Sequence, residues 1–343
     1  MQYLFLEGNL KSNTQIVVAV IWCLFINCSS NRAEDNFLDC REICQFGSKY
    51  VEWFHSSNLD SMIAYIQNTD YKLSELTEFR ESVKSQLGNR IGLLNVQYGI
   101  EPWQYYYIQY NHFKKVDQPV RTLFTFSKKG MILQFSVQVL QQEAKTRFSD
   151  YITKTKLSLP FKEKWFVAWG GRSINENQHA ISKSQRFAFD FVIRKRCKTF
   201  EGNGKLNDNY HCYEKEIIAP GEGTVVDILD GVEENQVGQV PETHGNRVII
   251  DHNNGEFSVL SHFKNGSIAV KLNDHVERGQ FLGLCGNTGA SSEPHIHYHL
   301  QNSPDINNAE GLPIKFDSFL LNGKYAEFFE PKIGEYVQNH TRQ

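Results

Sequence analysis

In the C-terminal half of the chain, apolar residues alternate with polar ones in short runs that Gly, Asn or Pro interrupts. Such alternation is typical of half-buried β-strands joined by tight turns. Strands are predicted over 186–193, 218–226, 246–251, 256–262 and 276–283. Asn253-Asn-Gly255 favours a hairpin, because Asn-Gly accepts the positive φ angles of tight hairpin turns. This half of the chain is therefore predicted to be a compact, barrel-like antiparallel β domain.

A different pattern runs through residues 34–157. Apolar positions at helical spacing predict helices over 40–65 and 73–87, although Gly47 interrupts the first. Aromatic-rich runs then predict strands over 104–110, 121–127 and 131–139. Helices followed by an antiparallel sheet favour a small α+β domain, similar to the cystatin-like modules that accompany many secreted enzymes. Residues 156–161 contain Pro160 and are predicted to link this domain to a second one over 162–343.

Length and composition agree with two mainly β domains. The chain has 343 residues, which exceeds a typical single domain, and its 15 Tyr and 24 Phe favour strands over a helical bundle. The formal net charge of -3 gives no basic surface of the kind that a phosphate backbone requires. Nucleic acid is therefore excluded as an expected partner, and we expect a monomer.

The first 30 residues carry a targeting pattern. The apolar run 16–26 follows Lys11 and is shorter than the roughly 20 residues that span a bilayer, so it predicts the core of a secretory signal. Two alternatives remain open. The segment could be a lipoprotein signal, because Cys28 resembles its acceptor cysteine, or it could be an uncleaved membrane anchor. All three predict export to the cell envelope or beyond, with membrane attachment through the N-terminus in the last two.

The cysteines give a weaker prediction. Cys197 and Cys212 flank a polar loop, and in an exported protein a bridge between them would contribute about 3 kcal/mol. Two free thiols are the alternative. Cys40 and Cys44 lie one helical turn apart, where buried thiols are favoured over a bridge.

Three histidines alternate in the segment 295–299. If that segment is extended, His295, His297 and His299 share one face, with neighbouring side chains roughly 7 Å apart. One imidazole could then bind a metal while the next reaches the atom that the metal activates. A His-rich surface strand without metal is the alternative.

Two further polar residues lie in unusual places. Asp190 is predicted on a strand face between Ala188 and Val192, where a carboxylate needs a partner. That partner is either an arginine, Arg186 or Arg194, or a metal ion. His262 ends another predicted strand and by itself would be an ordinary surface histidine.

Together these residues form a recognisable series, and the chain from Trp165 onward resembles the lysostaphin/LytM-type zinc endopeptidases, which cut peptide bonds in bacterial peptidoglycan. That family has a His followed by an Asp, a later His after Ser or Ala, and a His-x-His after a Gly-Asn-[Ser/Thr]-Gly turn and a Pro. The matching residues here are His179 with Asp190, His262 in Leu260-Ser-His262, and His295-Ile-His297 after Gly286-Asn-Thr-Gly289 and Pro294.

The resemblance implies that His179, Asp190 and His297 bind one zinc ion, and that His262 and His295 are catalytic. The spacing from His179 to Asp190 is longer than the three intervening residues common in the family, which places His179 on a loop rather than on the Asp190 strand. His299 is expected to be structural, with support of a zinc ligand as the alternative.

The implied protein is an exported zinc metalloendopeptidase that cleaves peptidoglycan peptides through a zinc-activated water. One alternative is a non-catalytic relative that binds cell wall or regulates a partner hydrolase. Another is a biotinyl- or lipoyl-like carrier, because 219–224 and 276–283 resemble the strand and turn sequences of such barrels. The carrier class is disfavoured, since no modifiable Lys is evident at a hairpin tip.

Overall fold

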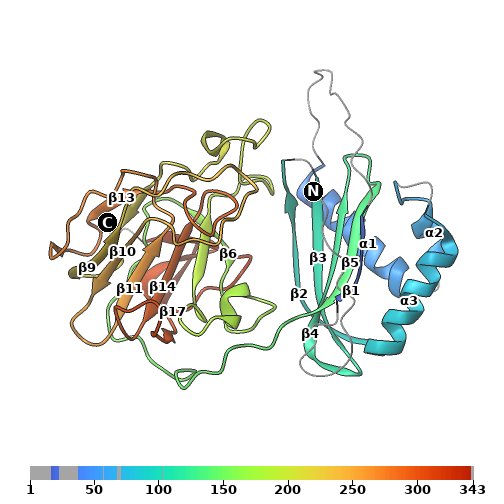
Figure 1. Ribbon diagram of the computed structural model, residues 1–343, viewed down its shortest axis with the longest axis horizontal. Helices are drawn as coiled ribbons and strands as arrows, with labels where there is room; N and C mark the ends of the chain where they lie inside the picture. Colours follow the sequence, from blue (N-terminus) through green and yellow to red (C-terminus); the bar gives the residue numbers. More distant parts are fainter. Residues whose placement is uncertain (1–16, 23–37, 57, 68–70, 103, 341–343) are drawn as a thin grey trace. The chain divides into compact units, whose positions relative to one another are not determined.

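The computed structural model describes residues 17–22, 38–56, 58–67, 71–102 and 104–340, and Figure 1 shows their arrangement. The chain divides into two compact units. Unit 1 comprises Met1–Tyr98 and Gln104–Gln141, and unit 2 comprises Gly99–Trp103 and Gln142–Gln343. Among the described residues, no helix is both long enough and apolar enough to cross a membrane.

Unit 1 is an antiparallel sheet with helices on one face (Figure 1). The helices are α1 (Cys40–His55), α2 (Leu59–Ile63) and α3 (Leu73–Leu87). The strands are β1 (Val17–Trp22), β2 (Arg90–Ile100), β3 (Tyr105–Phe113), β4 (Val116–Phe126) and β5 (Ile132–Val139), in the order β1-β5-β4-β3-β2. The predicted helices followed by strands are confirmed, whereas β2 was not predicted.

Local sequence explains how α1 begins and where it packs. The Asp39 carboxylate accepts hydrogen bonds from the backbone N–H groups of Arg41 and Glu42, both at 2.8 Å, which caps the first turn. Gly47 lies against the ring of Tyr107, where an added Cβ would lie 2.0 Å from the nearest ring atom. The glycine that weakens the helix prediction is therefore required by close packing of α1 on β3.

Unit 2 is mainly antiparallel β. Its strands are β6 (Trp165–Trp169), β7 (Phe189–Val192), β8 (Glu216–Ile218), β9 (Gly223–Leu229), β10 (Arg247–Asp251), β11 (Phe257–Ser261), β12 (His275–Val276), β13 (Phe281–Leu284), β14 (Ile296–Gln301), β15 (Gly311–Leu312), β16 (Phe316–Leu321), β17 (Lys324–Phe329) and β18 (Tyr336–Asn339). The large sheet has the order β12-β9-β10-β11-β14-β7-β6-β18-β16-β17, β15 pairs with β14, and β13 and β8 form a small second sheet. The predicted fold class, a mainly antiparallel β domain after a small α+β region, is confirmed.

The predicted linker 156–161 belongs instead to the core of unit 2. Leu157, Leu159 and Phe161 are fully buried in the same cluster as Trp165. The backbone N–H of Asp317 also donates to the Leu157 carbonyl at 2.7 Å. Alternate positions of an extended segment face the same side, so this apolar alternation directs the segment into the core despite its proline.

The predicted Cys197–Cys212 bridge is wrong. Cys212 is a buried free thiol whose Sγ donates to the Pro294 carbonyl at 2.9 Å, whereas Cys197 is disulfide-bonded to another cysteine. Cys44 is also free, so it does not pair with Cys40, but the expected pair of buried thiols is wrong as well, because Cys40 is disulfide-bonded and Cys44 is half-buried. Sequence separation alone cannot show which thiols a fold brings together. Of the predicted signal or anchor over residues 1–30, only β1 lies within the described residues, and export stays a prediction.

Candidate active site

Strand β14 lies between β7 and β11 in the large sheet, and this position brings the candidate residues together. Its register places His297 beside Asp190 of β7 on one side and beside Ser261 of β11 on the other. His297 and His299 line one cleft, while Tyr298 and Leu300 are fully buried in the core. The predicted division between a site face and a core face is therefore confirmed.

His179 reaches the same point from the short 3-10 helix Gln178–Ile181. Asn177 caps this turn, because its Oδ1 accepts the backbone N–H of His179 at 3.1 Å. The Asn177 side-chain amide also donates to the carbonyls of Gly171 and Ala188. These bonds fix the turn next to the start of β7, so the long spacing between His179 and Asp190 still brings the two side chains into contact.

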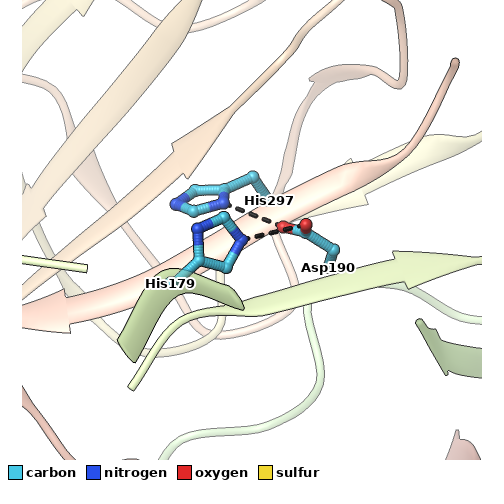
Figure 2. Close-up of side chains that lie close together, drawn as sticks. All are labelled: His179, Asp190 and His297. Carbon is cyan, nitrogen blue, oxygen red and sulfur yellow. Dashed lines mark hydrogen bonds and ion pairs between the residues drawn. The ribbon is translucent and has the colours of Figure 1, made fainter. Parts of the chain in front are cut away.

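Asp190 is the centre of the cluster. Its Oδ2 lies 2.9 Å from Nε2 of His179, and its Oδ1 lies 2.9 Å from Nδ1 of His297. Figure 2 shows both imidazole rings directed at this carboxylate. One potential ligand atom from each residue lies within 4.8 Å of the others. Two imidazole nitrogens and a carboxylate oxygen at such separations suit a single metal ion.

The electrostatics of the cluster keep Asp190 ionised. Burial by itself would raise the pKa of its carboxyl, but the nearby His179 and His295 rings and a hydrogen bond from His179 hold that pKa well below its usual range. Burial in turn lowers the pKa of His297, against the influence of Asp190. An ionised Asp190 beside a neutral His297 is a protonation state that suits metal binding. The arginine alternative for Asp190 is not realised by Arg186, which pairs with Glu143 at 2.9 Å.

His262 follows the end of β11 in an unusual backbone conformation. Its φ is 68°, in the left-handed region that is uncommon for residues other than glycine. Nδ1 lies 2.7 Å from the Thr288 carbonyl, which can only accept, so Nδ1 carries the hydrogen and Nε2 the lone pair. Burial and the neighbouring His295 and His297 lower the pKa of His262 well below its usual value.

His295 is held in the same tautomer. Its Nδ1 lies 2.9 Å from the Glu293 carbonyl and 3.2 Å from the Ser291 hydroxyl. Nε2 lies 3.7 Å from Oδ1 of Asp190. The rings of His295 and His262 are 4.5 Å apart between centroids. In their neutral forms these two imidazoles therefore present Nε2 lone pairs side by side, next to the potential metal ligands.

All five predicted site residues, together with His299, line a single cleft of about 540 Å³ in unit 2. Trp169, Arg247 and Glu293 also line it. Sequence reasoning identified the histidines and Asp190. It missed the groups that orient them, namely Asn177, Thr288 and Gln301, although Thr288 belongs to the Gly-Asn-Thr-Gly turn that carried the family resemblance.

Part of unit 2 matches the model of a known protein family. Residues 209–309 match the model of Peptidase family M23. This range includes His262, His295 and His297, whereas His179 and Asp190 precede it.

Curated relatives match over a similarly limited length. Cell division protein DipM of Caulobacter vibrioides (strain NA1000 / CB15N) is 32% identical over 106 residues, which are 31% of this chain and 16% of that protein. Peptidoglycan DD-endopeptidase ShyA of Vibrio cholerae serotype O1 (strain ATCC 39315 / El Tor Inaba N16961) is 45% identical over 56 residues, which are 16% of this chain and 13% of that protein. The chain thus spans less than a fifth of the length of either relative.

Among solved structures, the catalytic domain of lysostaphin from Staphylococcus simulans is similar at 18% identity and a TM-score of 0.27. The match covers 44% of this chain and 88% of that one. The catalytic domain of the M23 protein EnpA from Enterococcus faecalis matches at 20% identity and a TM-score of 0.27, covering 46% and 90%.

Proposed function

Because residues 209–309 match the model of Peptidase family M23, we propose that this protein is a zinc endopeptidase that cuts peptide bonds in bacterial peptidoglycan. The observation that carries the proposal is the convergence of His179, Asp190 and His297 within 4.8 Å, with two further imidazoles alongside. A binding protein would not need the two additional imidazoles.

The three grouped residues suit a catalytic rather than a structural zinc. Structural zinc sites have four protein ligands, whereas catalytic sites have three and keep one position open. His179 would bind through Nε2, His297 through Nδ1 and Asp190 through its carboxylate, since these atoms face one another. Zinc bound there supplies a Lewis acid that polarises a carbonyl and makes water a nucleophile near neutral pH.

His262 and His295 would act in proton transfer. Each has its Nδ1 hydrogen directed at a backbone carbonyl, so each presents the Nε2 lone pair as an acceptor. One imidazole would accept the proton of the attacking water at Nε2 and would then hold that proton toward the tetrahedral oxyanion, while the other would orient the attacking water through its own Nε2 lone pair. The proton would then pass to the amine that leaves. Both groups are positioned before substrate binds, which lowers the cost of reorganisation.

The substrate assignment is based on the relatives. ShyA is described as a peptidoglycan DD-endopeptidase, and peptidoglycan peptides are the substrate class that we propose for this chain. Action on that substrate would require export to the cell envelope, in agreement with the targeting pattern in residues 1–30. We further propose that unit 1 is an accessory domain and that unit 2, which begins before the expected boundary at 162, is the peptidase domain.

The test is digestion of purified sacculi by the full-length protein, with and without a chelator, and analysis of the released fragments by mass. We expect close to one zinc per chain, release of peptide-linked fragments, and loss of release after chelation that added zinc restores. Release that persists after complete metal removal would refute the zinc mechanism. Zinc binding without release from sacculi or a soluble cross-linked peptide would favour the non-catalytic relative.

A further inference from the structure

From His297, a row of hydrogen bonds runs along β14 toward the end of the strand at Gln301. Nε2 of His297 lies 3.0 Å from Nδ1 of His299, and Nε2 of His299 lies 3.0 Å from Oε1 of Gln301. The Gln301 amide nitrogen donates to the Ser303 carbonyl at 2.7 Å. All three residues are buried, with at most 4% of each residue exposed. They occupy alternate positions of one strand, so the row follows directly from the two-residue period.

The last member of the row sets the direction of every bond. The Ser303 carbonyl can only accept, so Gln301 must turn its amide nitrogen toward Ser303 and its Oε1 toward His299. An amide oxygen can only accept, so His299 must carry its hydrogen on Nε2. Its Nδ1 then has the lone pair and must accept from His297.

This direction determines the tautomer of His297. With its hydrogen on Nε2, the neutral ring has a bare lone pair on Nδ1, which faces Oδ1 of Asp190 at 2.9 Å. Two acceptors at this distance repel each other unless a cation lies beside them. The row therefore prepares His297 to bind a metal ion rather than to donate a proton to Asp190.

We infer that His299 and Gln301 are positioning residues that hold His297 in its Nε2–H tautomer, with Nδ1 available to the metal. The inference rests on the metal site of the proposed function. Metal-binding histidines commonly donate their second N–H to an acceptor that fixes the ring, and losing such a partner typically weakens metal binding about 10- to 100-fold. Here the acceptor is the His299 imidazole, which is held by the Gln301 amide, and that amide is itself oriented by the Ser303 carbonyl.

The chain offers variants that separate orientation from general stability. His299→Leu removes both polar atoms, whereas His299→Gln keeps an oxygen that can accept from His297 and an amide that can donate to Gln301. His252 is a matched control, because it is also buried in unit 2 and bonded on both ring nitrogens, to the Glu222 carbonyl and the Ser258 hydroxyl. It lies outside the cleft-lining set. His252→Leu therefore loses a similar pair of bonds away from the site.

The first readout needs no metal. Nitrogen-15 NMR of the metal-free full-length protein at about pH 8 reports which ring nitrogen of a neutral imidazole is protonated. We expect His297 to be in the Nε2–H form in the wild type, to shift toward the Nδ1–H form in His299→Leu, and to return in His299→Gln. His297 in the Nδ1–H form in the wild type would overturn the inference.

The second readout is zinc affinity by chelator competition. His299→Leu should weaken zinc binding about 10- to 100-fold, with His299→Gln and His252→Leu close to the wild type. Wild-type affinity in His299→Leu would refute the inference, as would equal losses in all three variants. A wild type that binds no zinc would refute the proposed metal site, and the NMR result would still decide whether the row fixes the tautomer.

Discussion

At the scale of single residues, ring orientation divides the histidines of the cleft into two kinds. His297 turns Nδ1 toward Asp190, whereas His262 and His295 turn Nδ1 toward backbone carbonyls. We therefore expect His297→Ala and Asp190→Ala to lose zinc and activity together. We expect His262→Ala and His295→Ala to keep zinc and the folded state while the rate falls by about 100- to 10,000-fold.

Zinc content and turnover measured on the same preparations of these four variants test this separation. Circular dichroism on each preparation controls for folding. Loss of zinc from His295→Ala with retention in His297→Ala would exchange the two roles.

Glu293 gives a prediction about pH. Burial raises the pKa of its carboxyl from 4.5 to about 7, and the Thr199 hydroxyl offsets this only in part. Between these two values the folded state binds a proton that the unfolded state has released, so the free energy of unfolding falls as pH rises. The side chain is only half-buried, and we expect a loss of about 1–3 kcal/mol across this window.

Urea unfolding of the wild type and of Glu293→Gln, at about pH 5 and about pH 8, measures this effect. The difference between the two proteins isolates Glu293, because all other titrating groups are shared. Glu293→Gln should lack this part of the pH dependence. An identical pH dependence in both proteins would show that the Glu293 proton is not linked to folding.

Residue-level features were predictable only where they follow from spacing. The two-residue period of a strand gave the shared face of His295, His297 and His299. The tautomers depend on carbonyls such as those of Thr288 and Ser303, whose directions arise from turns that the sequence does not determine. Pairing of distant cysteines depends in the same way on tertiary contacts, so the Cys197–Cys212 prediction failed.

At the scale of elements, the turn before β14 positions His262 through a tight backbone contact. Gly289 has φ 72°, and an added Cβ would lie 2.1 Å from the backbone nitrogen of Gly245. Gly289→Ala should therefore shift the turn and displace the Thr288 carbonyl that orients His262. We expect stability to fall by more than the roughly 1 kcal/mol of backbone strain alone, and activity to fall more than zinc content.

Gly255→Ala is the matched control for this change. Gly255 also has a positive φ, 84°, but no atom lies within 4 Å of the added Cβ. Thermal unfolding and turnover of both variants test the contact. Equal losses in the two would mean that backbone conformation, rather than the approach of Gly245, accounts for the effect.

Elements with a clear period and clear ends were predictable from sequence. The helix expected over 73–87 is α3, and the hairpin at Asn253-Asn-Gly255 joins β10 to β11. The edge strand β2 was missed because its exposed Ile91 and Leu93 blur the alternation of polar and apolar residues. Residues 156–161 were misassigned because a proline was given more weight than alternating apolar residues.

At the scale of the whole molecule, the boundary between the units decides whether a buried carboxylate of unit 2 keeps its hydrogen-bond donors. Glu256 is fully buried and accepts four hydrogen bonds from the segment 151–155. The donors are the Tyr151 hydroxyl, the backbone N–H groups of Lys154 and Thr155, and the Thr155 hydroxyl. A charge in the core is tolerated only with such partners. Residues before the expected boundary at 162 are therefore part of unit 2.

Two truncations test this conclusion. A fragment of residues 142–343 should fold and bind zinc, since it keeps the donors to Glu256 and the apolar side chains of Leu157, Leu159 and Phe161. A fragment of residues 162–343 loses all of them. Burial of three large apolar side chains is worth about 1.5–3 kcal/mol each, and a buried carboxylate left without partners costs several more.

That sum is comparable to the entire 5–15 kcal/mol of a typical domain, so we expect the shorter fragment to be unfolded or insoluble. Near-ultraviolet circular dichroism and zinc content distinguish the two fragments. Glu256→Gln in the longer fragment is the control, because it removes the charge and keeps an oxygen that can accept. If 162–343 folded and bound zinc as well as 142–343, segment 142–161 would be a peripheral segment that unit 2 does not need for folding.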